Sequence, residues 1–173
     1  MSAAIELESA PFIQKFKLIA SDNKSEFIID ERILNQSAVL KEMMEIQDKS
    51  EKDITIPLNQ ITAECLTNLI KFCKHYEDSP PYIPPSGPTS CLSKPPQNHW
   101  DMIFLKSLSS KQLFDIICAA NFLHIPRLID AGCFRLQYMI ENKTVEEIQR
   151  IFQAPGDFTA VEKEQMRNEP LWR

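Results

Sequence analysis

The side chains that could perform nucleophilic or metal chemistry in this chain are three histidines and five cysteines. The histidines, His75, His99 and His124, lie in separate segments, and no Cys-x-x-Cys pair is present. Cys73 and His75 have the spacing of half a metal site, but no second pair repeats it, and structural zinc takes four ligands. We therefore expect no metal site, and we interpret Cys73 as a buried thiol and His75 as a solvated residue at a helix end.

A thiol hydrolase would pair a cysteine with a histidine, and the candidates for the nucleophile are Cys118 and Cys133. Both stand among bulky apolar residues, so we expect inert packing in the core or in an interface. Glu146 and Glu147 are adjacent carboxylates, which diverge by about 100° on a helix. Roles in capping and in the helix dipole explain them without general acid catalysis. We expect a protein that is not an enzyme.

Composition excludes several other classes of protein. The chain of 173 residues has only three glycines, so a glycine-rich phosphate loop cannot be written, and we expect no cofactor. The net charge of -5 argues against a surface that binds nucleic acid. Its apolar runs fall short of the roughly 20 residues that span a bilayer, so we expect no membrane partner. The odd number of cysteines without a secretory signal favours reduced thiols in the cytoplasm and nucleus.

A proline-rich segment divides the elements that must position these residues. Seven of the twelve prolines lie between Pro80 and Pro96, which predicts an extended linker in which we expect little function. Before it, alternating apolar residues on both sides of a turn at 21–24 predict a hairpin, and residues 53–57 predict a strand. Helices are expected from Ser37 and after Thr62, the second with this apolar stripe: Leu66, Leu69, Ile70 and Cys73.

After the proline-rich segment only helices are expected. One begins at Pro126, which suits the first helical position, and runs to about Ile140. Three further helices open with reciprocal capping pairs, namely Ser109 with Gln112, Thr144 with Glu147, and Thr159 with Glu162. The last two span only two or three turns, so they are marginal in isolation and must dock on something. Both a fold-back onto the protein's own core and a partner surface stay open.

A series of motifs runs through the chain in a consistent order. The first is Ser21-Asp22, followed by Ile56-Pro57-Leu58, Phe72-Cys73-Lys74-His75, Trp100-Asp101, Ala119-Ala120-Asn121-Phe122-Leu123, Lys143-Thr144-Val145-Glu146-Glu147-Ile148, Asp157-Phe158-Thr159 and Trp172. From about Phe16 onward the chain resembles the Skp family, the adaptors of cullin–F-box ubiquitin ligases. Elongin C is similar only up to about Ile140 and lacks the tail helices.

The resemblance implies an α+β fold with two domains. Residues 15–140 would form a BTB/POZ-like domain that binds a cullin, with 80–99 as a proline-rich variable loop. Residues 141–173 would form a helical extension that binds an F-box. The implied function is a non-catalytic adaptor of an SCF-type E3 ligase, with cullin and F-box proteins as partners and a homodimer when the F-box is absent. The alternative is an elongin-C-like or self-assembling BTB interaction protein.

The same resemblance assigns site residues. Asn121 and Phe122 fall where the family contacts the cullin through an Asn-Tyr pair, and Phe122 lacks the tyrosine hydroxyl. An ordinary core position is the alternative for Phe122. The residues that correspond to the F-box face are Cys133, Leu136, Ile140, Ile148, Phe152 and Trp172. Packing between the tail helices is the alternative for this set.

Four departures from the family pattern stand out. Pro170 should end the last helix early, so Trp172 would be presented from an extended tail. The chain ends at Arg173 without the family's acidic residues. Ala160 replaces a proline that some members hydroxylate, and the leader over residues 1–14 has no counterpart. We interpret the chain as a divergent paralogue.

Overall fold

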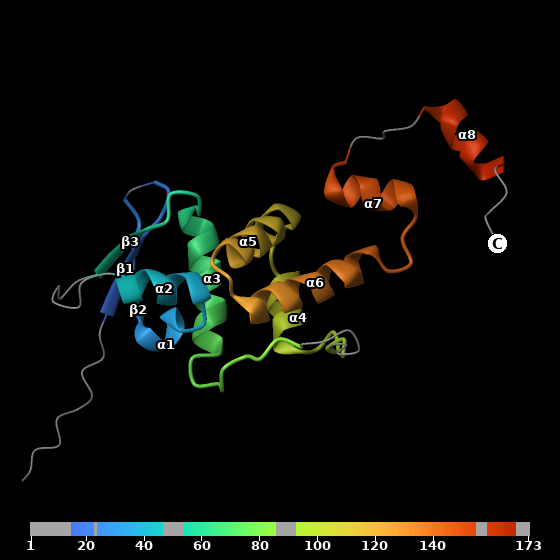
Figure 1. The fold of residues 1–173 in the computed structure, drawn as a ribbon. Coiled ribbons are helices and arrows are strands. Elements are labelled where there is room, and N and C mark those ends of the chain that lie inside the picture. Colours follow the sequence, from blue (N-terminus) through green and yellow to red (C-terminus); the bar gives the residue numbers. More distant parts are fainter. Residues whose placement is uncertain (1–14, 23, 47–53, 86–92, 155–158, 169–173) are drawn as a thin grey trace, which may run out of the picture. The chain divides into compact units, whose positions relative to one another are not determined.

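The computed structural model describes residues 15–22, 24–46, 54–85, 93–154 and 159–168 (Figure 1). The chain forms two compact units, one up to Arg135 and the other from Leu136. The leader, Cys91, Pro170, Trp172 and Arg173 lie outside the described residues. The predicted boundary at residue 140 separates a domain that would bind a cullin from an extension that would bind an F-box, and it stays a prediction.

A three-stranded sheet forms one side of the first unit. Its strands are β1 (Lys15–Ile19), β2 (Glu26–Asp30) and β3 (Ile54–Pro57), in the order β2-β1-β3. β1 pairs antiparallel with β2 and parallel with β3, and Phe16 and Leu18 of the central strand are buried. The Asp22 carboxylate accepts the backbone N–H groups of Lys24 and Ser25, and this closes the turn. The predicted hairpin and third strand are confirmed.

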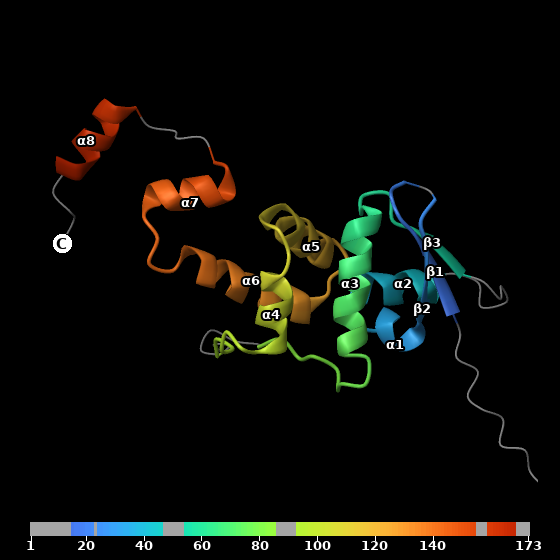
Figure 2. The same cartoon turned by 180° about the vertical axis from the view of Figure 1, so that it is seen from behind.

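Six helices follow or interrupt the sheet in the described part of the chain up to residue 140. They are α1 (Glu31–Leu34), α2 (Ala38–Ile46), α3 (Ala63–His75), α4 (Trp100–Lys106), α5 (Ser110–Phe122) and α6 (Pro126–Ile140). Figures 1 and 2 show α3 between the sheet with α1 and α2 on one side and α4 and α5 on the other. The predicted stripe of α3 is buried throughout, so this helix forms the middle of the core.

The predicted helix starts are present with their capping bonds. The Thr62 hydroxyl accepts the N–H of Cys65 at 3.3 Å, and the Ser109 hydroxyl accepts the N–H of Gln112 at the same distance. The Gln112 amide oxygen accepts the N–H of Ser109 at 2.8 Å, which completes the capping box. Each bond satisfies a first-turn donor that has no partner inside the helix. Among the described residues from 93 onward there is no strand, as expected.

Two helices, α1 and α4, are not predicted by the sequence pattern. The N-cap of α4 is His99, whose imidazole Nδ1 accepts the N–H of Asp101, and histidine is not among the preferred N-cap residues. The indole of Trp100 stacks on Phe104 at 5.1 Å and on His75 at 3.6 Å between ring centroids. His75 is exposed at a helix end as predicted, but its ring is occupied by this stacking.

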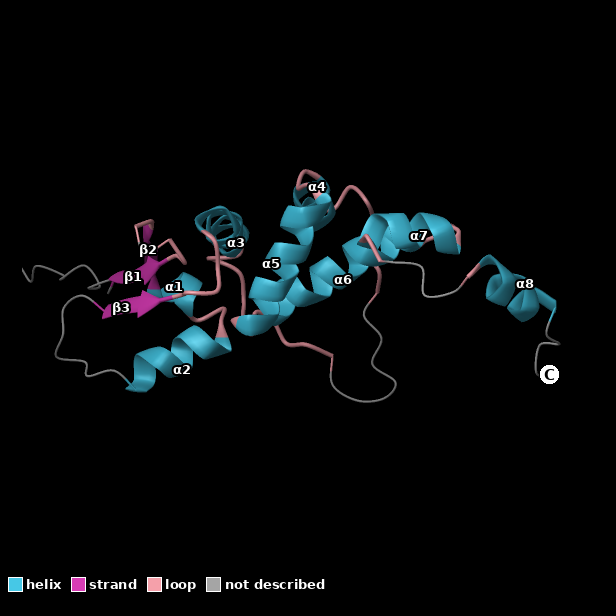
Figure 3. Cartoon of the chain, turned by 90° about the horizontal axis from the view of Figure 1, so that it is seen from above, coloured by secondary structure: helices cyan, strands magenta, loops and turns pink. Residues whose placement is uncertain are grey.

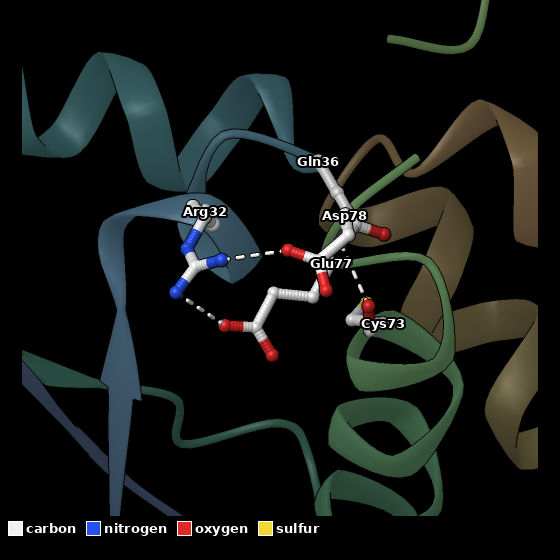
Figure 4. Close-up of polar contacts among 5 residues, drawn as sticks. All are labelled: Arg32, Gln36, Cys73, Glu77 and Asp78. Carbon is white, nitrogen blue, oxygen red and sulfur yellow. Dashed lines mark hydrogen bonds and ion pairs between the residues drawn. The ribbon is translucent and has the colours of Figure 1, made fainter. Parts of the chain in front are cut away.

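A polar clamp joins α1 to the end of α3 (Figure 4). The Arg32 guanidinium contacts Glu77 at 3.3 Å and Asp78 at 2.7 Å. Gln36 donates its side-chain amide to the Cys73 carbonyl at 2.8 Å. Exposed ion pairs contribute little stability individually, about 0–1 kcal/mol. Together these bonds fix the direction in which the chain leaves α3 toward the proline-rich segment.

The contact between α5 and α6 depends on a glycine. A Cβ built on the buried Gly132 would lie 2.6 Å from Cγ1 of Ile117, which is β-branched and stiff. Gly132→Ala gains about 1 kcal/mol in helix propensity, but overpacking costs about 1–3 kcal/mol. Because the 2.6 Å contact lies well inside van der Waals distance, the overpacking cost should fall in the upper part of this range, about 2–3 kcal/mol, and we expect Gly132→Ala to lower the free energy of unfolding by about 1–2 kcal/mol, measured by urea denaturation. The double variant Gly132→Ala with Ile117→Val should recover part of the loss, and equal stability of Gly132→Ala and wild type would contradict this packing.

The second unit contains the two short helices that the capping pairs predict. They are α7 (Val145–Phe152) and α8 (Ala160–Asn168). The Thr144 hydroxyl accepts the N–H of Glu147 at 3.3 Å, and Thr159 and Glu162 repeat the pattern. Figure 3 shows both as separate helical segments. In the part of the chain that the structure describes, no helix is long and apolar enough to cross a membrane.

Candidate partner-binding surfaces

A groove of about 300 Å³ lies between the start of α3 and one side of α5. Its lining combines apolar and sulfur-containing side chains with polar and charged ones. The lining residues are Gln60, Ile61, Thr62, Cys65, Lys111, Asp115, Cys118, Ala119 and Phe122. A groove with this lining can receive an apolar side chain of a partner and contact polar groups at its edge.

Asn121 and Phe122 are the last two residues of α5, and both are exposed. The side chain of Phe122 is 43% exposed and lines the groove. The core position that was the alternative for Phe122 is therefore wrong. A large exposed aromatic beside a groove is typical of the anchors that dominate binding interfaces. The assignment of these residues to a cullin contact stays a prediction.

Buried hydrogen bonds position the end of α5. The buried Ser37 hydroxyl donates to the Leu123 carbonyl and also accepts the N–H of Leu40, so it caps α2 at the same time. The Ala38 N–H donates to the His124 carbonyl at 3.3 Å. His124 has a positive φ of 53°, which turns the chain sharply after α5. Phe122 thus stands directly before a rigid corner.

Three of the predicted F-box residues share one face of α6. Cys133, Leu136 and Ile140 are spaced by three and four residues, which places them along one side of a helix. Cys133 is exposed, Leu136 is half-buried and Ile140 is 37% exposed. The face is apolar and accessible, as a partner surface requires.

The other two described residues of this set share one face of α7. Ile148 and Phe152 are four residues apart, with Ile151 beside them, while Glu146 and Arg150 lie on other sides. No residue of α7 is buried, Ile148 is half-buried, and Phe152 is 40% exposed. A helix of eight residues is marginal in water unless its apolar face is covered. Most of this face is accessible to a partner, and the F-box assignment and the packing between the tail helices that is its alternative both stay predictions.

The four cysteines that the structure describes divide into two pairs. Cys65 and Cys73 are buried, and burial raises the pKa of the Cys65 thiol to about 11 and that of Cys73 to about 12. Cys118 and Cys133 are exposed, so the expectation that they pack inertly in the core is wrong. Their helices bury other faces, namely Leu113, Ile116 and Ala120 on α5 and Leu128, Ala131 and Gly132 on α6. Interface packing is the interpretation that the structure leaves for them.

Sequence reasoning missed the groove beside Phe122, because its lining comes from two distant segments. Ile61, Cys65 and Cys118 are the apolar and thiol-bearing members that were not assigned a site. Cys118 lies two residues after the buried Ile116 and two before the buried Ala120, and this position on the helix was a signal that its side chain faces outward. Among the described residues, no group of three or more His, Cys, Asp or Glu side chains could hold a metal ion.

Comparison with protein families gives two matches. Residues 14–78 match a family model described as "Skp1 family, tetramerisation domain". Residues 126–173 match one described as "Skp1 family, dimerisation domain". The first match covers the sheet and α1 to α3, and the second covers α6 to the end of the chain. Together they span more than half of the chain, on both sides of the proline-rich segment.

Curated relatives are similar over almost the whole chain. The "Suppressor of kinetochore protein 1" of Schizosaccharomyces pombe is 34% identical over 92% of this chain and 98% of its own length. The "S-phase kinase-associated protein 1 homolog" of Tetrahymena thermophila is 38% identical over 91% and 93%. The "SCF ubiquitin ligase complex protein SKP1b" of Dictyostelium discoideum is 37% identical over 90% and 93%.

Proposed function

The chain belongs to the Skp1 family, and from this premise we propose that it is an adaptor subunit of an SCF-type E3 ubiquitin ligase. It bridges a cullin to F-box substrate receptors and makes or breaks no bond itself. The BTB/POZ-like unit with the groove beside Phe122 binds the cullin. The faces of α6 and α7, continued by the tail, bind the F-box.

The observation that carries the proposal is that each unit offers an exposed apolar surface. In the first unit it is the groove with Phe122, and in the second it is the face of α7, a helix that buries none of its residues. A catalytic protein would instead concentrate titratable groups in one cleft. Two separate apolar surfaces are what a bridging protein needs. The elongin-C-like or self-assembling alternative is not favoured, because the family match extends through residue 173.

A bridging experiment tests the proposal. Each cullin of a panel is immobilised, and an F-box protein is added with and without the chain. We expect the F-box protein to be retained only when the chain is present, for at least one pair. If the chain binds neither class of protein in any combination, the adaptor function is wrong.

Thiol alkylation should report the two surfaces separately. In the free chain, iodoacetamide should label Cys118 and Cys133 quickly and Cys65 and Cys73 slowly, because the thiolate is the reactive species and burial raises the pKa of the latter pair. A bound cullin should slow labelling of Cys118 by about tenfold or more, since this thiol lines the groove with Phe122. A bound F-box protein should slow labelling of Cys133 instead. Peptide mass spectrometry measures each rate.

Each partner serves as the control for the other in this experiment. Cullin should leave Cys133 unchanged, and the F-box protein should leave Cys118 unchanged. Protection of Cys133 by the cullin with Cys118 unaffected would reverse the assignment of the two surfaces. Rapid labelling of Cys73 in the free chain would contradict the fold, because its side chain is 1% exposed.

A homodimer through the vacant F-box face is part of the proposal. Its support is the exposed apolar face of α7, together with the description of the matching family domain as a dimerisation domain. An F-box peptide should convert the dimer to a monomer in sedimentation. A dimer that persists with the peptide bound would place the dimer contact elsewhere. The cytoplasmic and nuclear location stays a prediction.

A further inference from the structure

The start of the proline-rich segment is a short stretch of constrained backbone. Residues 79–85 read Ser-Pro-Pro-Tyr-Ile-Pro-Pro and form neither helix nor strand. Proline fixes its own φ near −65°, and a residue before proline is pushed to extended backbone. The fixed φ applies to the four prolines, Pro80, Pro81, Pro84 and Pro85. The restriction before proline applies to Ile83. These constraints favour the polyproline II conformation, which has three residues per turn.

Two residues of α6 hold this stretch against the first unit. The Tyr82 hydroxyl donates to the Asp130 carboxylate at 2.6 Å, and Arg127 donates to the Pro80 carbonyl at 3.2 Å. The Arg127 guanidinium also lies over the rings of Tyr76 and Tyr82, at 4.1 and 5.1 Å from their centroids. Burial and the Asp130 carboxylate raise the pKa of Tyr82 to about 12, so its hydroxyl stays a donor at neutral pH.

The exposure of the side chains separates Tyr82 from its neighbours. Ser79 and Tyr82 are half-buried, whereas Pro80, Pro81, Pro84 and Pro85 are exposed. Ile83 is 84% exposed, although it is a large aliphatic residue. One edge of the stretch is therefore fixed to the protein through Tyr82. The prolines and Ile83 are presented to solvent.

We propose that residues 80–84 are a preformed ligand for an SH3-type domain. Such domains dock P-x-x-P segments in polyproline II conformation in grooves lined by aromatic residues. In this chain the spacing places Pro80 with Pro81 and Ile83 with Pro84 as two apolar pairs one turn apart. Tyr82, between the pairs, faces the protein and is used for anchoring. The bonds to Asp130 and Arg127 restrain the segment in the free chain, which reduces the entropy lost on binding.

The surroundings of the segment indicate the charge of the partner. The prolines form part of the wall of a hollow of about 530 Å³, whose lining also includes Arg32, Lys41, Glu77 and Arg127. Arg32 is neutralised by Glu77 and Asp78, but Lys41 makes no ion pair within the described residues. The three cations of the hollow thus outnumber the carboxylates Glu77 and Asp78 by one, which leaves a small positive excess in a chain of net charge -5. An SH3-type domain with acidic residues beside its aromatic groove is complementary to it.

This surface is independent of the adaptor function. The hollow and the groove beside Phe122 share no lining residue. An SH3-type partner and a cullin could then bind one chain at the same time. Residues 80–84 would then have a function, although we expected little function in the proline-rich segment.

Binding to purified domains tests the proposal. The full chain is immobilised, and panels of SH3 domains and of WW domains are passed over it. We expect at least one SH3 domain to bind, and the double variant Pro81→Ala with Pro84→Ala to bind it at least about tenfold more weakly. Both prolines are exposed, so the variant should fold, which circular dichroism checks. The matched control is Pro95→Ala with Pro96→Ala, outside the segment, which should keep wild-type affinity.

A second variant tests the anchoring of the segment. Tyr82→Phe removes the bond to Asp130 and keeps the ring, so the affinity should fall about threefold while the prolines are unchanged. Unchanged affinity of Tyr82→Phe would overturn the preformed geometry. The proposal as a whole is overturned if no SH3 domain distinguishes the chain from the double proline variant, or if only WW domains bind. It is also overturned if a synthetic peptide of residues 78–85 binds an SH3 domain that the folded chain does not.

Discussion

Deletion of residues 144–173 is expected to abolish F-box binding, with a loss of at least about 100-fold in affinity, while cullin binding stays within about twofold. The deletion removes α7 and its apolar face, together with Ile148, Phe152 and the tail that carries Trp172. It leaves intact the core of the first unit, which ends at Arg135, and the groove beside Phe122. Immobilised F-box protein and cullin, each titrated with the truncated chain, give the two affinities.

A point variant guards against an indirect effect of the deletion. Phe152→Ala should weaken F-box binding by about tenfold or more, as truncation of a central aromatic anchor does. Ile46→Ala is the matched control, because Ile46 is an exposed apolar residue at the end of α2, outside both proposed surfaces. Survival of F-box capture in the truncated chain would show that the F-box face lies elsewhere.

The elements with local signals could be predicted from the sequence. A capping box needs only two residues three apart, and Thr144 with Glu147 forms it as expected. The hairpin follows from the alternation around Phe16 and Leu18, because a period of two buries one face of a strand. Pro126 and Ile140 mark the two ends of α6 as the pattern indicated.

Elements fixed by distant contacts could not be predicted. α4 lacks a conventional cap, and its first turn depends on stacking of Trp100 against His75, which is 25 positions earlier in the chain. α1 has only four residues, too few for a helical period to show. It is held at the end of α3 by the clamp of Arg32 with Glu77 and Asp78. A tertiary contact of this kind leaves no local pattern.

One part of the candidate site could be predicted from the sequence and another part could not. The face of α7 follows from the spacing of Ile148 and Phe152 within one helix, which sequence shows directly. The exposure of Cys118 depends on the phase of α5 relative to the core. The buried face of α5 is marked by Leu113, Ile116 and Ala120. Cys118 is two residues past Ile116, so its side chain points about 200° away from that residue around the helix. Apolar neighbours in sequence were therefore a poor guide to burial.

Phe122→Ala is expected to weaken cullin binding by about 30-fold, which corresponds to about 2 kcal/mol for a truncated aromatic anchor. The Phe122 side chain is 43% exposed and lies outside the buried core, so stability should change by less than about 1 kcal/mol. Phe122→Tyr keeps the ring and supplies the hydroxyl that the Skp family pattern has at this position, so its affinity should equal or exceed that of the wild type. Ile103→Ala, at another exposed apolar residue of the same unit, is the matched control. Calorimetric titration with a cullin measures the three variants, and F-box binding confirms that each is folded. A Phe122→Ala chain that binds cullin as the wild type does would mean that the groove beside this residue is not the cullin surface.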